Sequence, residues 1–140
     1  MPTAEHELPL EPVRDDPAVA AVLLEESLGV KVPGHRSSRT ASGDCADLSP
    51  KGYRGDAVAC FTDAAGRDVL AAVVEVQRSP GEHKRSSWPV YHSTVRARLE
   101  CDTALMVLCF DRATAAWART PILTGHPEYA LSPLVVGPDE

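Results

Sequence analysis

Two acidic residues, Asp56 and Glu75, lie in apolar runs on either side of a turn sequence. A turn centred between Ala65 and Gly66 pairs the two runs as an antiparallel hairpin in which Asp56 lies directly opposite Glu75. Two carboxylates so close repel each other, and burial strengthens the repulsion because little water screens the charges. A divalent cation would relieve it, since Mg²⁺ typically takes one or two carboxylates, a carbonyl oxygen and several waters. The pair therefore predicts a Mg²⁺ or Mn²⁺ site.

Gln77 follows Glu75 by two residues and points to the same face of the strand. Its side chain offers an oxygen or an amide donor to whatever binds beside the carboxylates. The alternative is that a basic side chain such as Arg54, opposite Gln77 in the same register, neutralises the pair as a structural ion cluster. The residues alone leave both interpretations open.

The hairpin that positions these residues has apolar side chains on both of its faces. Runs over 53–61 and 69–77 predict two inner strands of a sheet that is covered on both sides. In the same register Val58 faces Val73 and Cys60 faces Ala71. Upstream, an acidic cap, a proline and a later glycine predict a helix over 18–28, and residues 36–42 favour an edge strand.

A second helix should follow the hairpin, opened by Ser87 with Pro89 in its first turn. Its apolar face consists of residues at intervals of three and four, namely Trp88, Tyr91, Val95 and Leu99. Beyond it we expect a strand over 104–110, a helix over 113–119, a loop over 121–127 and a last strand over 131–136. Strands separated by helical crossovers predict an α/β fold with a mixed central β-sheet flanked by helices.

Asp56 followed, after a hairpin, by Glu75-Val76-Gln77 resembles the PD-(D/E)XK nuclease superfamily, in the variant with Gln in place of the motif lysine. The later segments Lys84-Arg85, Trp88-Pro89-Val90-Tyr91 and Arg96-Ala97-Arg98-Leu99 are similar to the helix of the Rpn-type, transposase-associated nuclease-like proteins and related bacterial proteins. The resemblance covers residues 53–136. It implies a restriction-endonuclease-like αβββαβ core and Mg²⁺-dependent cleavage of a DNA phosphodiester.

The same resemblance implies roles for individual residues. Asp56 and Glu75 would be metal ligands, the Val76 carbonyl a third, and Glu7 the acidic residue that the first helix adds. Gln77 stands where the lysine helps to position or activate water, but a neutral amide supplies no positive charge. Either Lys84 or Arg85 then brings the cation, or the chemistry is weakened or lost. The catalytic set is therefore Asp56, Glu75, Gln77 and Lys84.

The whole chain is acidic, whereas the segment between positions 75 and 98 is basic. A formal net charge of −6 excludes attraction of a phosphate backbone by bulk charge. Between positions 75 and 98, however, five basic residues stand against two acidic ones. DNA contacts are expected from four of the basic residues, Arg78, Arg85, Arg96 and Arg98. The alternative for Arg96 and Arg98 is that they only solvate a helix flank.

Length and composition bound the remaining possibilities. The 140 residues predict one nuclease-like domain over 1–140, with an N-terminal helical segment at 1–30 and a core at 53–136. No apolar run is long enough to span a membrane, and an acidic start broken by prolines favours the cytoplasm over secretion. Four widely spaced cysteines favour neither zinc nor disulfides. Two functions stay open, a metal-dependent DNA phosphodiesterase and a catalytically degenerate nuclease-fold protein that acts as a binding or regulatory module. A third, a plain α/β interaction protein with an ion cluster, applies if the hairpin register is different. A homodimer is among the oligomeric states left open.

Overall fold

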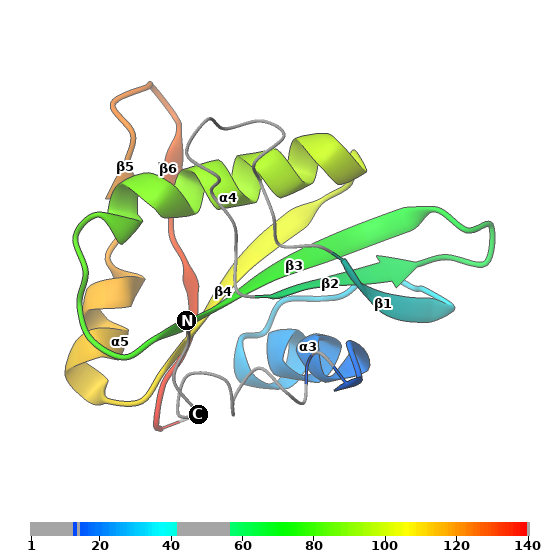
Figure 1. Ribbon diagram of the computed structural model, residues 1–140, viewed down its shortest axis with the longest axis horizontal. Coiled ribbons are helices and arrows are strands. Elements are labelled where there is room, and N and C mark those ends of the chain that lie inside the picture. The colour runs from blue at the N-terminus through cyan, green and yellow to red at the C-terminus, as the bar shows by residue number, and fades with distance from the viewer. Residues whose placement is uncertain (1–12, 14, 42–56, 140) are drawn as a thin grey trace.

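The computed structural model of the protein describes residues 13, 15–41 and 57–139. Two predicted site residues, Glu7 and Asp56, lie outside the described residues, as does Arg54. The elements that position the site are the sheet strands and the two helices that follow the central hairpin (Figure 1).

Five strands form one mixed sheet in the order β1-β2-β3-β4-β7. The bounds are Ser37–Ala41 for β1, Ala57–Thr62 for β2, Asp68–Gln77 for β3, Thr103–Cys109 for β4 and Leu134–Val136 for β7. β1, β2 and β3 pair antiparallel, whereas β4 joins β3 in parallel and β7 joins β4 in parallel. The predicted α/β class with a mixed sheet is confirmed.

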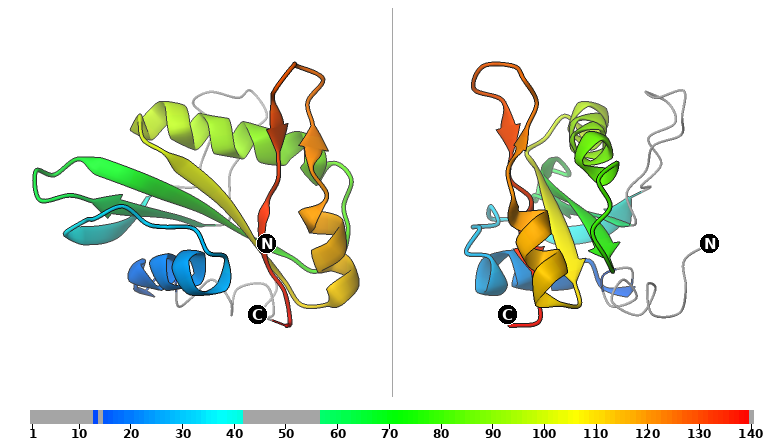
Figure 2. Two further views of the ribbon diagram at one scale, coloured as in Figure 1. Left: turned by 180° about the vertical axis from the view of Figure 1, so that it is seen from behind. Right: turned by 90° about the vertical axis from the view of Figure 1, so that its left-hand side faces the viewer.

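Helices cover both faces of this sheet, as the apolar strands require. α4 (Lys84–Leu99) and α5 (Arg112–Arg119) pack with one core cluster, and the N-terminal pair α3 (Ala18–Val22) and η1 (Leu23–Ser27) packs with the other. Figure 1 and Figure 2 show α4 along one side of the strands and α3 along the opposite side. The prediction of an inner sheet covered on two sides is therefore confirmed.

The register of the β2–β3 hairpin agrees with the sequence prediction. Val58 pairs with Val73 and Cys60 with Ala71, and the register shifts only after Phe61. The turn is held by Asp63, whose carboxylate oxygen Oδ1 accepts hydrogen bonds of 2.9 Å from the backbone N–H groups of Ala65 and Arg67. The outermost pair described is Ala57 with Val74, so the expected Asp56 partner of Glu75 falls outside the described residues.

The predicted start of the second helix at Ser87 is wrong, because α4 begins three residues earlier, at Lys84. Backbone hydrogen bonds from Lys84 N to Gly81 O and from Arg85 N to Glu82 O already turn the chain before the helix proper. Pro89 therefore lies inside the helix rather than in its first turn. The predicted apolar stripe is correct, since Trp88, Tyr91 and Val95 are buried and Leu99 packs against them.

Three further elements differ from the prediction, namely the last strand, the expected loop and the first helix. The predicted strand over 131–136 is divided into β6 (Ala130–Leu131) and β7, because Pro133 between them has no N–H to donate. β6 pairs with β5 (Ile122–Leu123), which lies in the segment expected to be a loop. The helix expected over 18–28 continues as the π-helical turn η1, where Leu28 N bonds Leu23 O at 3.2 Å. Among the described helices, none has the length and hydropathy of a membrane-spanning segment.

Candidate functional site

Glu75 is a buried carboxylate near the carboxyl end of the central strand β3. Only 2% of its surface is exposed. Glu75 is two residues after Val73, so the two side chains lie on the same face of the sheet, the face that α4 covers. On the neighbouring strand it is in register with Val107, which is fully buried. The carboxylate therefore lies in a largely apolar layer between the sheet and α4, where a charge is costly unless other groups stabilise it.

Gln77 lies on the same face as Glu75, at the end of the strand, and is half-buried. Its Nε2 donates a hydrogen bond of 2.6 Å to the carbonyl oxygen of Ser79. This bond uses one of the two N–H donors of the amide, so the second N–H and the Oε1 acceptor can both meet a water, and Oε1 can also meet a cation. Both functions that the sequence allowed for this side chain, an oxygen ligand and an amide donor, therefore stay open.

Gly81 brings the loop after β3 close to both Gln77 and Lys84. A Cβ atom at position 81 would lie 3.3 Å from Gln77 Nε2 and 3.9 Å from Lys84 Cγ. A contact of 3.3 Å is tight, so a larger residue would displace the Gln77 amide. Glycine at this position therefore leaves room for the Gln77 amide in the orientation that it has.

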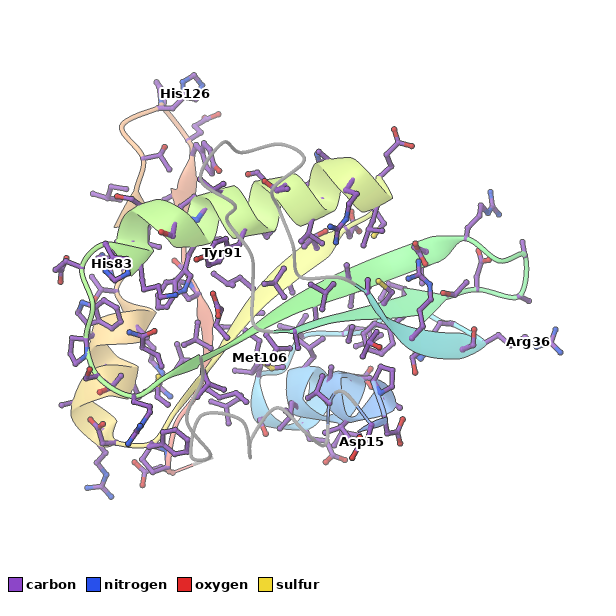
Figure 3. All side chains as sticks on the ribbon, viewed as in Figure 1. Asp15, Arg36, His83, Tyr91, Met106 and His126 are labelled. Carbon is purple, nitrogen blue, oxygen red and sulfur yellow. The ribbon has the colours of Figure 1, made fainter. Side chains whose placement is uncertain are left out.

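Lys84 and Tyr91 lie two turns apart on α4, on the side that faces the sheet. The Lys84 ammonium nitrogen lies 5.6 Å from the centroid of the Tyr91 ring, within the range of a cation–π interaction. Tyr91 is 7% exposed, and Figure 3 shows its side chain between α4 and the strands. The Lys84 ammonium group therefore lies near the Tyr91 ring, which packs between α4 and the sheet face that also carries Glu75.

Electrostatics connect Tyr91 to both charged residues of the site. Burial raises the pKa of the Tyr91 hydroxyl, and the negative charge of Glu75 raises this pKa further. The positive charge of Lys84 and hydrogen bonds with Ser87 and Lys84 act in the opposite direction on the same pKa. The carboxylate and the ammonium group therefore both act on one hydroxyl group, and Glu75, Lys84 and Tyr91 form a single polar cluster.

The donor atoms of this cluster fit Mg²⁺ or Mn²⁺ in kind, because both ions prefer carboxylate and amide oxygens. The cluster supplies the Glu75 carboxylate, and the Gln77 oxygen lies beside it on the same strand face. In the described part of the chain no three His, Cys, Asp or Glu residues come together as a metal-binding group. Val76, the expected source of a ligand carbonyl, is 4% exposed in the same strand. The second carboxylate of the prediction is Asp56, which the described residues do not include.

Arg85, a predicted DNA contact, bonds instead to the end of α5. Its guanidinium donates to the carbonyl oxygens of Thr120 at 2.7 Å, Pro121 at 3.0 Å and Trp117 at 3.3 Å. The guanidinium carbon also lies 5.7 Å from the Trp117 ring centroid. A cation at the last carbonyls of a helix satisfies acceptors that have no partner within the helix and interacts favourably with its dipole. Arg85 therefore fastens α4 to α5.

The other predicted DNA contacts lie at two separate places. Arg78 is exposed directly after β3, near the Gln77 end of the site. Arg96 and Arg98 are in the last turn of α4, roughly 18 Å from Lys84 along the helix axis at 1.5 Å per residue. Arg96 is exposed and Arg98 half-buried. The structure thus places Lys84 near Tyr91 and, beside Gly81, on the side of the Gln77 amide, but it does not gather all the basic residues into one patch.

Sequence reasoning missed Tyr91 as a site residue and assigned it to core packing. Tyr91 does pack in the core, but its hydroxyl also meets the charges of Glu75 and Lys84. The available signal was its spacing of seven residues from Lys84, which places both on one helix face once the helix begins at Lys84. The sequence analysis also missed a contact between α5 and the segment before α4, in which Trp117 Nε1 donates a hydrogen bond of 2.8 Å to Glu82 Oε1.

Comparisons with known proteins give no relative for this chain. No protein-family model matches it, and neither a curated protein nor a solved structure shows significant similarity. Membership of the PD-(D/E)XK superfamily stays a prediction from the motif, and the function of the site rests on the chain's own residues.

Proposed function

We propose that the protein is a metal-dependent DNA phosphodiesterase of the PD-(D/E)XK type. The observation that supports the proposal is that Glu75 and Gln77 share one face at the end of β3, and that Gln77 and Lys84, the first residue of α4, both lie beside Gly81. The element order α3-β1-β2-β3-α4-β4 is also the order that a restriction-endonuclease-like αβββαβ core requires. DNA in the cytoplasm is the expected substrate.

In this proposal Asp56 and Glu75 hold the metal, with the Val76 carbonyl and Glu7 as further ligands. When bound, Mg²⁺ or Mn²⁺ supplies Lewis-acid stabilisation of the charge that develops on the scissile phosphate. The Gln77 oxygen accepts a hydrogen bond from water and orients it, while one N–H of the same amide donates to the carbonyl oxygen of Ser79. Glu75 is rigidly positioned by its place in the middle of the sheet.

Lys84 supplies the positive charge that Gln77 cannot. It is favoured over Arg85 because the Arg85 guanidinium donates to three carbonyl oxygens at the end of α5. For the same reason Arg85 is left out of the proposed DNA surface. Arg78 is the basic residue next to the site, and Arg96 and Arg98 would contact the phosphate backbone farther along α4.

One observation favours a second function, that of a catalytically degenerate nuclease fold acting as a binding or regulatory module. Glu75 is only 2% exposed, whereas a metal ion and a phosphate group must both reach a catalytic carboxylate. If α4 keeps Glu75 covered, the fold retains the residues of the site without their chemistry. The two functions differ in whether the bound metal supports cleavage.

Metal titration followed by a plasmid-nicking assay tests the proposal. Mn²⁺ and Mg²⁺ are titrated calorimetrically into wild type, Glu75→Gln and the matched control Glu26→Gln, which changes an exposed glutamate on η1. We expect wild type and Glu26→Gln to bind metal and nick DNA, and Glu75→Gln to lose both. Binding without nicking would support the second function. If no metal binds to wild type, the proposed phosphodiesterase is wrong.

A further inference from the structure

A small pocket lies between α5 and the segment that follows β7. Its volume is about 200 Å³, which is enough for several water molecules at about 30 Å³ each, or for one phosphate group. The residues that line it are Arg112, Ala115, Arg119, Gly137, Pro138 and Asp139. Among the described residues of the Glu75 site, neither Glu75 nor Gln77 nor Lys84 lines this pocket, so the two places are distinct.

The pocket lies outside the carboxyl ends of two parallel strands. β4 ends at Cys109, shortly before α5 begins at Arg112, and β7 ends at Val136, directly before Gly137. Figure 2 shows the chain after β7 close to α5 in both of its views. This edge is where open α/β sheets usually bind their ligands.

Two arginines of α5 supply the positive charge of the pocket. Arg112 and Arg119 are seven residues apart on the helix, so they lie on one helix face, and both line the pocket. Ala115 is on the same face between them, and its small side chain leaves space for a ligand. The nearby acidic residue Asp111 is not a lining residue, because its carboxylate caps α5 by accepting hydrogen bonds from Thr114.

A carboxylate group of the protein already binds to one of these arginines. Arg112 donates two hydrogen bonds to Asp139, from Nε to Oδ2 at 2.9 Å and from Nη2 to Oδ1 at 3.0 Å. This paired geometry is the one by which arginine recognises carboxylate and phosphate groups. The two side chains are 82% and 63% exposed, so water screens the ion pair and the pair is weak. An oxyanion from solution can therefore displace Asp139.

We propose that Arg112 and Arg119 form a binding site for a phosphate group, and that Asp139 competes for this site as an internal ligand. Both oxygens of the Asp139 carboxylate are used by the single guanidinium group of Arg112. The free oxygens of a phosphate group point in tetrahedral directions, so they can accept hydrogen bonds from two guanidinium groups at once. The inference does not depend on the proposed phosphodiesterase, because it requires neither a metal ion nor Glu75.

The test is a titration of sodium phosphate into the metal-free protein at constant ionic strength, followed by NMR of the arginine Nε–H signals. We expect the Arg112 and Arg119 signals to shift together and to saturate. Arg112→Gln and Arg119→Gln should each weaken phosphate binding about tenfold, through the loss of charge-assisted hydrogen bonds. The matched control is Arg67→Gln, which removes an arginine from another exposed ion pair, 3.6 Å from Asp63, and it should bind phosphate as wild type does.

Two results of this titration would overturn the inference. One is a wild-type protein whose Arg112 and Arg119 signals do not shift or do not saturate. The other is equal phosphate affinity in Arg112→Gln, Arg119→Gln and Arg67→Gln. All three substituted side chains are exposed, so the variants should fold, and circular dichroism verifies that they do.

Asp139→Asn tests the competition by the internal carboxylate. Removing its charge should strengthen phosphate binding about threefold, which is the range expected for an exposed ion pair. The matched control Glu26→Gln makes the same change in net charge at an exposed glutamate of η1, and it should leave the phosphate affinity unchanged. Equal phosphate affinities in Asp139→Asn and Glu26→Gln would overturn the competition.

A second titration distinguishes free phosphate from the backbone of a nucleic acid as the source of the phosphate group. The probe is a short DNA duplex without terminal phosphates. Shifts of the Arg112 and Arg119 signals with this duplex would assign the site to backbone phosphates, whereas shifts with sodium phosphate alone would assign it to a free phosphate group; both results support the site. Because these titrations contain no metal, their failure is distinguishable from failure of Mn²⁺ binding through Glu75.

Discussion

Replacing Arg85 by alanine should destabilise the protein, because this arginine joins α4 to the end of α5. Its two shorter hydrogen bonds, 2.7 Å to Thr120 O and 3.0 Å to Pro121 O, have the geometry of charge-assisted bonds. At partial exposure each contributes about 1 kcal/mol, and the contact with the Trp117 ring adds about 0.5 kcal/mol. The expected loss is about 2–3 kcal/mol, or a fall in Tm of roughly 6–9 °C for a chain of this size.

Urea unfolding followed by far-UV circular dichroism measures this loss. Arg96→Ala is the matched control, because Arg96 is an exposed arginine of the same helix, and it should cost less than about 0.5 kcal/mol. Arg85→Lys keeps the charge but loses the planar fork, so its stability should lie between those of wild type and Arg85→Ala. Equal stabilities of Arg85→Ala and Arg96→Ala would refute the assignment of Arg85 to α5 and return it to the candidate DNA contacts.

Three other perturbations test different parts of the structure. Asp111→Ala should lower the Tm and Asp111→Asn should lower it less, because Asp111 caps α5 by accepting a backbone N–H at 2.8 Å. The backbone hydrogen bond from Thr114 holds the pKa of Asp111 below its ordinary value of 3.8. The stabilisation of the protein by ionised Asp111 is therefore complete above pH 3.8 and is lost as the pH falls through the lower pKa of the folded state. Thermal melts of wild type and Asp111→Ala at a series of pH values measure this loss. Gly81→Ala should displace the Gln77 amide and reduce DNA nicking while the Tm changes little; unchanged nicking would contradict the placement of Gln77 in the site. In the β5–β6 hairpin, Ile122→Ala should cost about 2–4 kcal/mol in urea unfolding, whereas Leu123→Ala should cost almost nothing, since Ile122 is 6% exposed and Leu123 is 81% exposed.

The hairpin register was predictable because it depends on local information. The turn residues fix where the chain reverses, and alternation of side chains then fixes which residues face each other. The apolar stripe of α4 was predictable for the same reason, since a helix repeats every few residues. Both features hold in the structure, at Val58 with Val73 and at Trp88, Tyr91 and Val95.

What the sequence did not reveal depends on contacts between distant segments. The start of α4 is set by the turn at Gly81, whereas Pro89 suggested a later start. Arg85 meets carbonyl oxygens 32 to 36 residues further along the chain, and nothing near Arg85 marks them. A basic residue next to a predicted site is therefore easily predicted to bind a ligand, although in the folded protein it bonds to a neighbouring helix.

The mixed pairing of the sheet has a consequence for the order of folding. β2 and β3 are joined by a short turn and pair antiparallel, so their contacts are local and can form within microseconds. β4 joins β3 in parallel only after the chain passes through α4, and loops of that length close more slowly. Glu75 projects from the face of β3 that α4 covers, so its carboxylate stays hydrated while the hairpin forms without α4. The desolvation of its charge then coincides with the docking of α4, when Lys84 arrives on the same helix.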